Sequence, residues 1–182
     1  MGLHSADYPM DDCGDDALCA AAPEGGEPEV SEDFLQALTL FQSVLAVPRA
    51  EPLDAEAEQQ GAELFQRTGC TACHAPSLPV EGIQGISAIA AYTDLRRHDL
   101  GEELADRRLD GEIIKSRWRT APLWGIAHLP RAGHLGLLHD GRARSVEEAV
   151  LWHAGEADES RRQFMALPKS QRDRLLDWTL RR

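Results

Sequence analysis

The sequence predicts an all-α protein in which short helices are joined by long loops. Apolar residues recur at helical spacing in residues 31–48, where Phe34, Leu38, Phe41 and Leu45 form one stripe. No segment alternates polar and apolar residues over the length of an ordinary strand. Glycine and proline disfavour long regular elements, so the segments that are rich in them are expected to be loops. These segments are residues 76–93 and 115–144.

Capping residues and stop signals place the first two helices. One is expected to begin after Ser31 and to end at Pro48. The other is expected to follow Asp54 and to stop near Gly69. Cys70 comes next in the chain, so the cysteine motif that it opens is predicted to lie at a helix C-terminus.

Two more helices are expected toward the end of the chain. Ser145 and Glu148 form a capping box before an apolar run, and Gly155 suits the C-terminal stop of that helix. The last helix is expected to begin near Pro168 or Ser170, with leucines and a tryptophan as its apolar residues.

A Cys-x-x-Cys-His motif is the strongest chemical signal in the chain. Cys70, Cys73 and His74 have the spacing of covalent c-type haem attachment, in which two thiols bind the porphyrin and the histidine binds the iron. The alternatives are a redox dithiol or half of a zinc site. A zinc site would need two more ligands at close spacing, whereas Cys13 and Cys19 lie far away in an irregular region.

The second axial ligand of such a haem would come from six other histidines or three methionines. His153 shares a helical face with Val146, Ala149 and Val150, so its imidazole is expected to point toward the interior. A histidine on an apolar face is more often an ordinary core residue, but a haem must also pack against apolar side chains. His153 is therefore the first candidate, and Met165 is the second.

Cys13 and Cys19 are expected to form a disulfide. Five residues separate them in an irregular region. Covalent haem attachment takes place outside the cytoplasm, where disulfides persist. The same reasoning predicts a periplasmic or otherwise extracytoplasmic protein.

The formal net charge of −12 is unevenly distributed. Residues 1–33 hold ten acidic side chains and no Lys or Arg, while the remainder holds 21 acidic and 19 basic residues. Without a basic surplus, nucleic-acid binding is not expected. No apolar run is long enough to span a bilayer, and the first residues lack the pattern of a signal peptide.

Because the acidic charge is concentrated at the start of the chain, residues 1–30 are predicted to be an acidic, irregular arm. This arm is either solvated and poorly ordered or a docking surface for a basic redox partner.

Several stretches carry a family resemblance, the most specific being "TAPLWG" and "LHDGRA" followed by "EEA". With "GAELFQRTGCTACH" and "YTDLRRHDLGEELAD", they make residues from about 30 to 182 resemble the C-terminal half of the di-haem oxidoreductases. That family is also called putative di-haem peroxidases or thiol oxidoreductases, and it is related to bacterial di-haem cytochrome c peroxidase. The region of Cys13 and Cys19 is similar to the segment that joins the two haem domains in this family.

The resemblance implies a ligand and several neighbours of the haem. His153 stands fourteen positions after His139, at the place where relatives present the second ligand of the C-terminal haem, so bis-histidine iron is implied. Met165 falls in a variable segment. Asp94 and His98, like His139, resemble hydrogen-bonded loop anchors. The resemblance also places Arg119, Arg142 and Arg144 near the haem, where they would pair with its propionates. It places Trp124 at the haem as well.

The chain departs from the family in one respect, because it holds one Cys-x-x-Cys-His motif where the family has two. The N-terminal haem domain, which binds substrate in the peroxidases, is missing from it. We therefore predict a single c-type cytochrome domain over residues 31–182, with a class I-like cytochrome c fold around one covalent haem c, that transfers electrons.

Two alternatives to a carrier stay open. In one, the chain is the half of a di-haem peroxidase that takes in electrons, and the catalytic haem domain is absent from it. In the other, the cysteines form a haem-free redox dithiol. Whether the chain is itself an enzyme depends on which reading holds.

Overall fold

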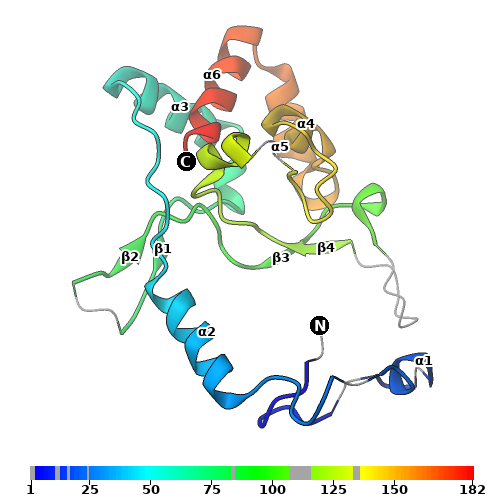
Figure 1. Cartoon of the computed structure of the whole chain (residues 1–182). Helices are drawn as coiled ribbons and strands as arrows, with labels where there is room; N and C mark the ends of the chain where they lie inside the picture. The colour runs from blue at the N-terminus through cyan, green and yellow to red at the C-terminus, as the bar shows by residue number, and fades with distance from the viewer. Residues whose placement is uncertain are drawn as a thin grey trace. The chain divides into compact units, whose positions relative to one another are not determined.

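The described chain forms two compact units. Contacts divide it into a first unit that ends at Ala46 and a second unit that begins at Val47. The computed structural model (Figure 1) describes residues 3–10, 13–15, 17–23, 25–82, 85–106, 116–132 and 136–182, without the side chains of residues 130–132.

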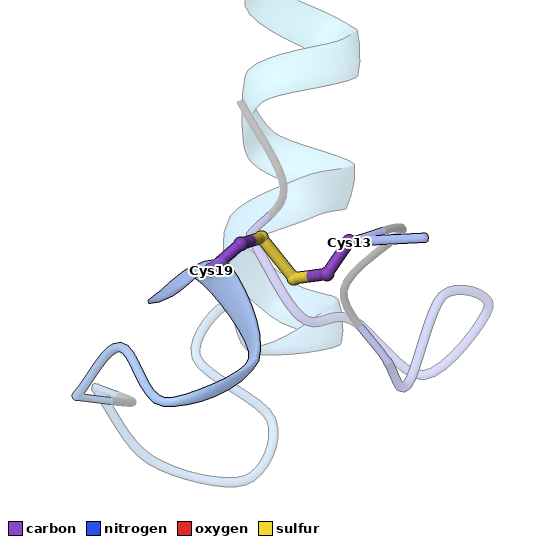
Figure 2. The surroundings of a disulfide bond; sticks show 2 residues. All are labelled: Cys13 and Cys19. Carbon is purple, nitrogen blue, oxygen red and sulfur yellow. A yellow bond between two sulfur atoms is a disulfide. The ribbon is translucent and has the colours of Figure 1, made fainter. Parts of the chain in front are cut away.

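The described residues of the first unit contain two helices and a disulfide. Helix α1 is Ala17–Ala20 and helix α2 is Glu32–Val44. Cys13 precedes α1 and Cys19 lies within it, and their sulfur atoms are bonded, as Figure 2 shows. The disulfide therefore closes a short loop around the start of α1.

Helix α2 begins where the capping signal predicts. The side chain of Ser31 accepts a hydrogen bond from the backbone N–H of Phe34 at 3.3 Å. The helix ends at Val44, before Pro48, because Leu45 is already extended. No residue of α2 is buried, so the apolar stripe that predicted the helix is exposed in the structure.

Helices make up most of the regular secondary structure described in the second unit. Each of its described helices is too short or too polar to cross a membrane. Its α-helices are α3 (Ala55–Arg67), α4 (Val146–Trp152), α5 (Asp158–Ala166) and α6 (Lys169–Leu180). Its strands are β1 (Leu78–Pro79), β2 (Ala88–Ile89), β3 (Arg97–Asp99) and β4 (Arg117–Arg119). Its 3-10 helices are η1 (Cys70–Ala72), η2 (Glu102–Leu104), η3 (Ile126–Ala132) and η4 (Gly155–Ala157).

Two small sheets show that the predicted all-α class, with its class I-like cytochrome c fold, is wrong. Strands β1 and β2 pair antiparallel, with Leu78 opposite Ile89. Strands β3 and β4 also pair antiparallel, with Arg97 opposite Arg119. Each strand has only two or three residues, which is too few to display an alternating pattern in the sequence. The fold is therefore mixed, with helices in the majority.

The main core of the second unit joins α3, α5 and α6. It consists of Leu64 and Phe65 from α3, Phe164 from α5, and Leu175 and Trp178 from α6. Helix α6 packs against α3 and α4, and α5 packs against α4 (Figure 1). Burying one such side chain stabilises the fold by about 1.5–3 kcal/mol. This core forms at the C-terminal half of α3, directly before the cysteine motif.

Candidate functional site

A single 3-10 turn places the two thiols. Gly69 follows α3 in the left-handed region, at φ 78°, and the chain enters η1 (Cys70–Ala72) at once. Side chains three residues apart eclipse each other in a 3-10 helix, so Cys70 and Cys73 lie on the same side of the turn. The N–H of His74 donates to the carbonyl of Cys70 at 2.9 Å. The turn therefore brings both thiols and the first imidazole together.

The thiols have the environment of protonated cysteines. Both are half-buried, and neither is part of a disulfide. Burial raises the pKa of the Cys70 thiol, although the hydroxyl oxygen of Thr68 lies 3.3 Å from its sulfur. Burial also raises the pKa of the Cys73 thiol, and the nearby carboxylates of Asp94 and Glu156 add to that effect. A redox dithiol instead needs a lowered thiol pKa, so this environment disfavours that alternative.

A strained backbone segment orients His74. Its Nδ1 lies 3.0 Å from the carbonyl oxygen of Tyr92, which can only accept, so Nδ1–H donates and Nε2 keeps its lone pair. Tyr92 has φ 52°, a left-handed value that non-glycine residues rarely adopt. Its ring packs edge-on against Phe65 and Trp178, which holds the strained backbone in place. Burial, opposed by the Tyr92 hydrogen bond, lowers the pKa of His74 to about 4.

His153 has the same hydrogen-bonding pattern at the end of α4. Its Nδ1 lies 2.6 Å from the carbonyl oxygen of Ala149, so Nδ1–H again donates and Nε2 keeps its lone pair. Its backbone N–H donates to the carbonyl of Val150 at 3.1 Å, which closes the last turn of the helix. Burial lowers the pKa of His153, which favours its neutral form.

The two imidazoles lie close enough to interact electrostatically. His153 is one of the groups that lower the pKa of His74, although the two residues stand far apart in the sequence. Within the part of the chain that the structure describes, neither Nε2 has a hydrogen-bond partner. Metal-binding histidines commonly donate Nδ1–H to a backbone carbonyl, which fixes the tautomer and exposes Nε2 to the metal. The donor set, with two cysteines directly before His74 and a second imidazole with the same tautomer, suits a covalent haem.

A carboxylate–imidazole–carboxylate bridge lies next to these residues. His98 is held between Asp94, at 2.8 Å from Nε2, and Glu156, at 2.9 Å from Nδ1. Both carboxylates accept, so both ring nitrogens donate and His98 is an imidazolium. Glu156 and then Asp94 raise the pKa of His98 accordingly. The hydrogen bonds expected for Asp94 and His98 are therefore present, and we refer to these three residues as the Asp94–His98–Glu156 bridge.

Glu156 and Tyr92 had not been recognised from the sequence. Glu156 could have been suspected, because it follows the Gly155 stop signal three residues after the candidate ligand His153. The role of Tyr92 has no sequence signal, because its carbonyl belongs to the backbone and its positive φ is not encoded by a glycine.

The structure does not bring the predicted arginines to the imidazoles. Arg119 is exposed on β4, opposite Arg97, and strand alternation points it away from the face that carries Trp118. Arg142 pairs with Asp140 at 2.6 Å and stands 4.9 Å from the centre of the Trp152 ring. Their contribution to haem binding stays a prediction.

The other residues predicted at or near the haem differ in exposure and in their contacts. Trp124 is half-buried in the loop before η3. Arg144 pairs with Glu148 at 3.1 Å. His139 stacks on Trp118 with ring centres 3.6 Å apart, in keeping with a structural role. Met165 is 47% exposed on α5. Among the described residues, no group of three or more His, Cys, Asp or Glu side chains is arranged to hold a metal ion by itself.

Comparison with known proteins identifies the family. Neither the curated proteins nor the solved structures contain a match to the chain. A family model described as "Di-haem oxidoreductase, putative peroxidase" matches residues 15–181, which is most of the chain. The match confirms the family indicated by the sequence motifs, and the family name supports haem as the cofactor class. The chain belongs to the di-haem oxidoreductase, putative peroxidase, family.

Proposed function

We propose that this chain is an electron-transfer domain that binds one haem c. Cys70 and Cys73 would hold the porphyrin covalently, and His74 and His153 would be the two axial ligands. One observation carries the proposal: His74, which follows the two cysteines directly, and His153 lie within electrostatic reach of each other, and each is tied by Nδ1 to a backbone carbonyl. A haem bound here would supply one-electron redox chemistry.

The residues favour electron transfer over binding of a substrate at the iron. The carbonyls of Tyr92 and Ala149 fix the tautomer of the two histidines, so both can offer Nε2 as a ligand. Two nitrogen ligands would fill both axial positions. They would also set a lower reduction potential than a histidine–methionine pair, since methionine ligation raises the potential.

The location and the partner are part of the same proposal. Thioether formation and the Cys13–Cys19 disulfide both suit an oxidising compartment, so we propose the periplasm or another extracytoplasmic location. The acidic side chains of residues 1–33 favour a basic redox partner.

A second candidate function follows from the family. Its description names two haems, whereas the sequence of this chain contains one Cys-x-x-Cys-His motif. We propose as the alternative that the chain is the half of a di-haem oxidoreductase that takes in electrons. The catalytic haem would then belong to an N-terminal domain absent from this chain.

Optical and paramagnetic-resonance spectra of the haem-loaded chain test the ligand set. Low-spin ferric iron is expected, without the absorption band of a methionine–iron bond. His153→Ala should convert the iron to high spin, whereas Met165→Ala, the control at the other candidate ligand, should leave the spectrum unchanged. High-spin iron in the wild-type chain would reject bis-histidine ligation. Peroxide turnover by the isolated chain would contradict the role of a simple carrier.

A further inference from the structure

The chain that follows His153 lies directly against strand β3. Gly155 has φ 56°, and a Cβ at this position would overlap the carbonyl oxygen of Asp99 and lie 2.9 Å from the backbone nitrogen of Gly101. A Cβ at Gly101 would in turn lie 3.3 Å from the Cβ of Ala154. The two glycines therefore allow a backbone contact that side chains would prevent.

Glu156 fastens this contact with both of its carboxylate oxygens. One oxygen accepts a hydrogen bond from the backbone N–H of Asp99 at 3.0 Å, and the other accepts from Nδ1–H of His98 at 2.9 Å. Arg117 of the neighbouring strand lies 3.8 Å from the same carboxylate. The side chain of Glu156 is 46% exposed, so water competes for it, but charge-assisted bonds to two different groups offset part of that competition.

The bridge continues from Glu156 to the segment that orients the first histidine. His98 donates through Nε2 to Asp94. Asp94 is two residues beyond Tyr92, whose carbonyl accepts the hydrogen bond from His74. The segment after His153 is therefore linked to the segment that orients His74. The link runs through the side chains of the bridge from Glu156 to Asp94, and then along the backbone from Asp94 to Tyr92.

We propose that Glu156 is a positioning residue that holds His153 in place relative to His74. The inference rests on the proposed ligation of iron by these two histidines. His153 is the first residue after α4, so the path of the chain beyond it decides where its imidazole can lie. Because Glu156 fixes that path on β3, loss of its carboxylate should allow His153 to leave the iron and external ligands to take its place.

The test uses the full-length, haem-loaded chain and its Glu156→Gln and Glu156→Ala variants. Glu147→Ala is the matched control, since Glu147 is an exposed carboxylate on α4, the helix directly before His153. The readouts are the spin state of the ferric iron and the rate of cyanide binding. Loss of outer partners of a metal-binding histidine changes metal binding or activity about 10- to 100-fold. We expect cyanide binding to accelerate by about that factor in Glu156→Ala.

The conservative variant separates positioning from general damage to the fold. Gln at position 156 keeps one carbonyl oxygen and loses the charge, so its rate should fall between those of the wild type and Glu156→Ala. Glu147→Ala should bind cyanide at the wild-type rate. If Glu156→Ala does not fold, Glu156→Gln and His98→Gln decide the question, because each removes part of the bridge.

The outcomes distinguish this inference from the proposed function. Wild-type rates in the Glu156 and His98 variants, with low-spin iron in the wild-type chain, would overturn the positioning role and leave the ligand assignment intact. High-spin iron in the wild-type chain, or an unchanged spectrum in His153→Ala, would instead overturn the proposed ligation itself.

Discussion

Trp178 occupies the space beside Gly61 that a larger residue would need. A Cβ at Gly61 would overlap the indole ring of Trp178, so α3 and α6 meet with backbone against ring. Glycine inside a helix costs about 0.5–1 kcal/mol relative to alanine. Glycine at this position leaves room for the indole, which can therefore reach the core and the ring of Tyr92, 5.6 Å away between ring centres.

Gly61→Ala should therefore destabilise the second unit, although alanine is the better helix former. Overpacking of a filled core costs about 1–3 kcal/mol, which exceeds the gain in helix propensity. Urea denaturation of the wild type, Gly61→Ala and Gly61→Val should show a graded loss. Gln66→Ala, an exposed change on the same helix, is the control and should have little effect. A more stable Gly61→Ala protein would contradict the close approach.

The stability of the second unit should fall in acid because of Glu58. The guanidinium of Arg182 donates to both carboxylate oxygens of Glu58, at 2.8 and 2.7 Å, and holds the pKa of Glu58 below its ordinary 4.5. A lowered pKa stabilises the fold above the unfolded-state value, and this contribution is lost as the pH falls through the folded-state value. Since Glu58 is 43% exposed, solvent screening limits the contribution to about 1 kcal/mol.

The free energy of unfolding, measured by urea denaturation from pH 7 to pH 3, tests this dependence. The wild type should lose stability below about pH 4.5, and Glu58→Gln should show a smaller loss. Glu63→Gln, an exposed change on the same helix, should follow the wild-type curve. Identical curves for the wild type and Glu58→Gln would show that the pair with Arg182 does not carry the effect.

Covalent haem attachment should require only one of the two thiols of the motif. Cys70→Ala and Cys73→Ala should each retain haem on a denaturing gel stained for haem, because one bond to the porphyrin remains. The double variant should release it. Cys13→Ser with Cys19→Ser is the control, since these residues lie in the first unit. Haem retained by the Cys70/Cys73 double variant would place the attachment elsewhere.

The disulfide should stabilise the first unit alone. A loop closed between Cys13 and Cys19, six positions apart, gains on the order of 2 kcal/mol from the restriction of the unfolded chain. After replacement of both cysteines by serine, amide hydrogen exchange should become faster in peptides of residues 13–23. Peptides from α3 and α6 should exchange as before. Equal exchange throughout would mean that the disulfide does not order this segment.

The helices with side-chain caps were predictable from the sequence. Asp54 accepts a hydrogen bond from Ala57 N–H at 2.8 Å, and Ser145 accepts one from Glu148 N–H at 3.0 Å, as their positions before apolar runs predict. Helix α5 was not predicted. It begins at Asp158 without a side-chain cap and buries only Phe164, so the capping signal that marks the other two helices is lacking at its start.

The strands were hidden for a different reason. Strands β3 and β4 consist largely of charged residues, and they pair across more than fifteen intervening positions, as between Arg97 and Arg119. Such pairing depends on tertiary contacts such as the hydrogen bond from Trp118 to the carbonyl of Leu104, at 2.7 Å, and not on local preference.

The candidate site was only partly accessible to sequence reasoning. The motif and the helical period singled out His74 and His153, because side-chain chemistry and spacing mark them. The groups that orient these histidines are the backbone carbonyls of Tyr92 and Ala149. Every residue has a backbone carbonyl, so residue types do not show which carbonyls orient the two histidines. These hydrogen bonds are found only in the three-dimensional structure.

The contact of Trp178 with α3 also has a consequence for the order of folding. The indole N–H reaches Glu58 across 120 positions of the chain, and contacts between such distant segments form late, since closing a long loop costs entropy. The packing of α6 against α3, beside Cys70, would therefore be completed late in the folding of the second unit. Until then the sulfur of Cys70 would lack part of the apolar core that packs beside it in the folded protein.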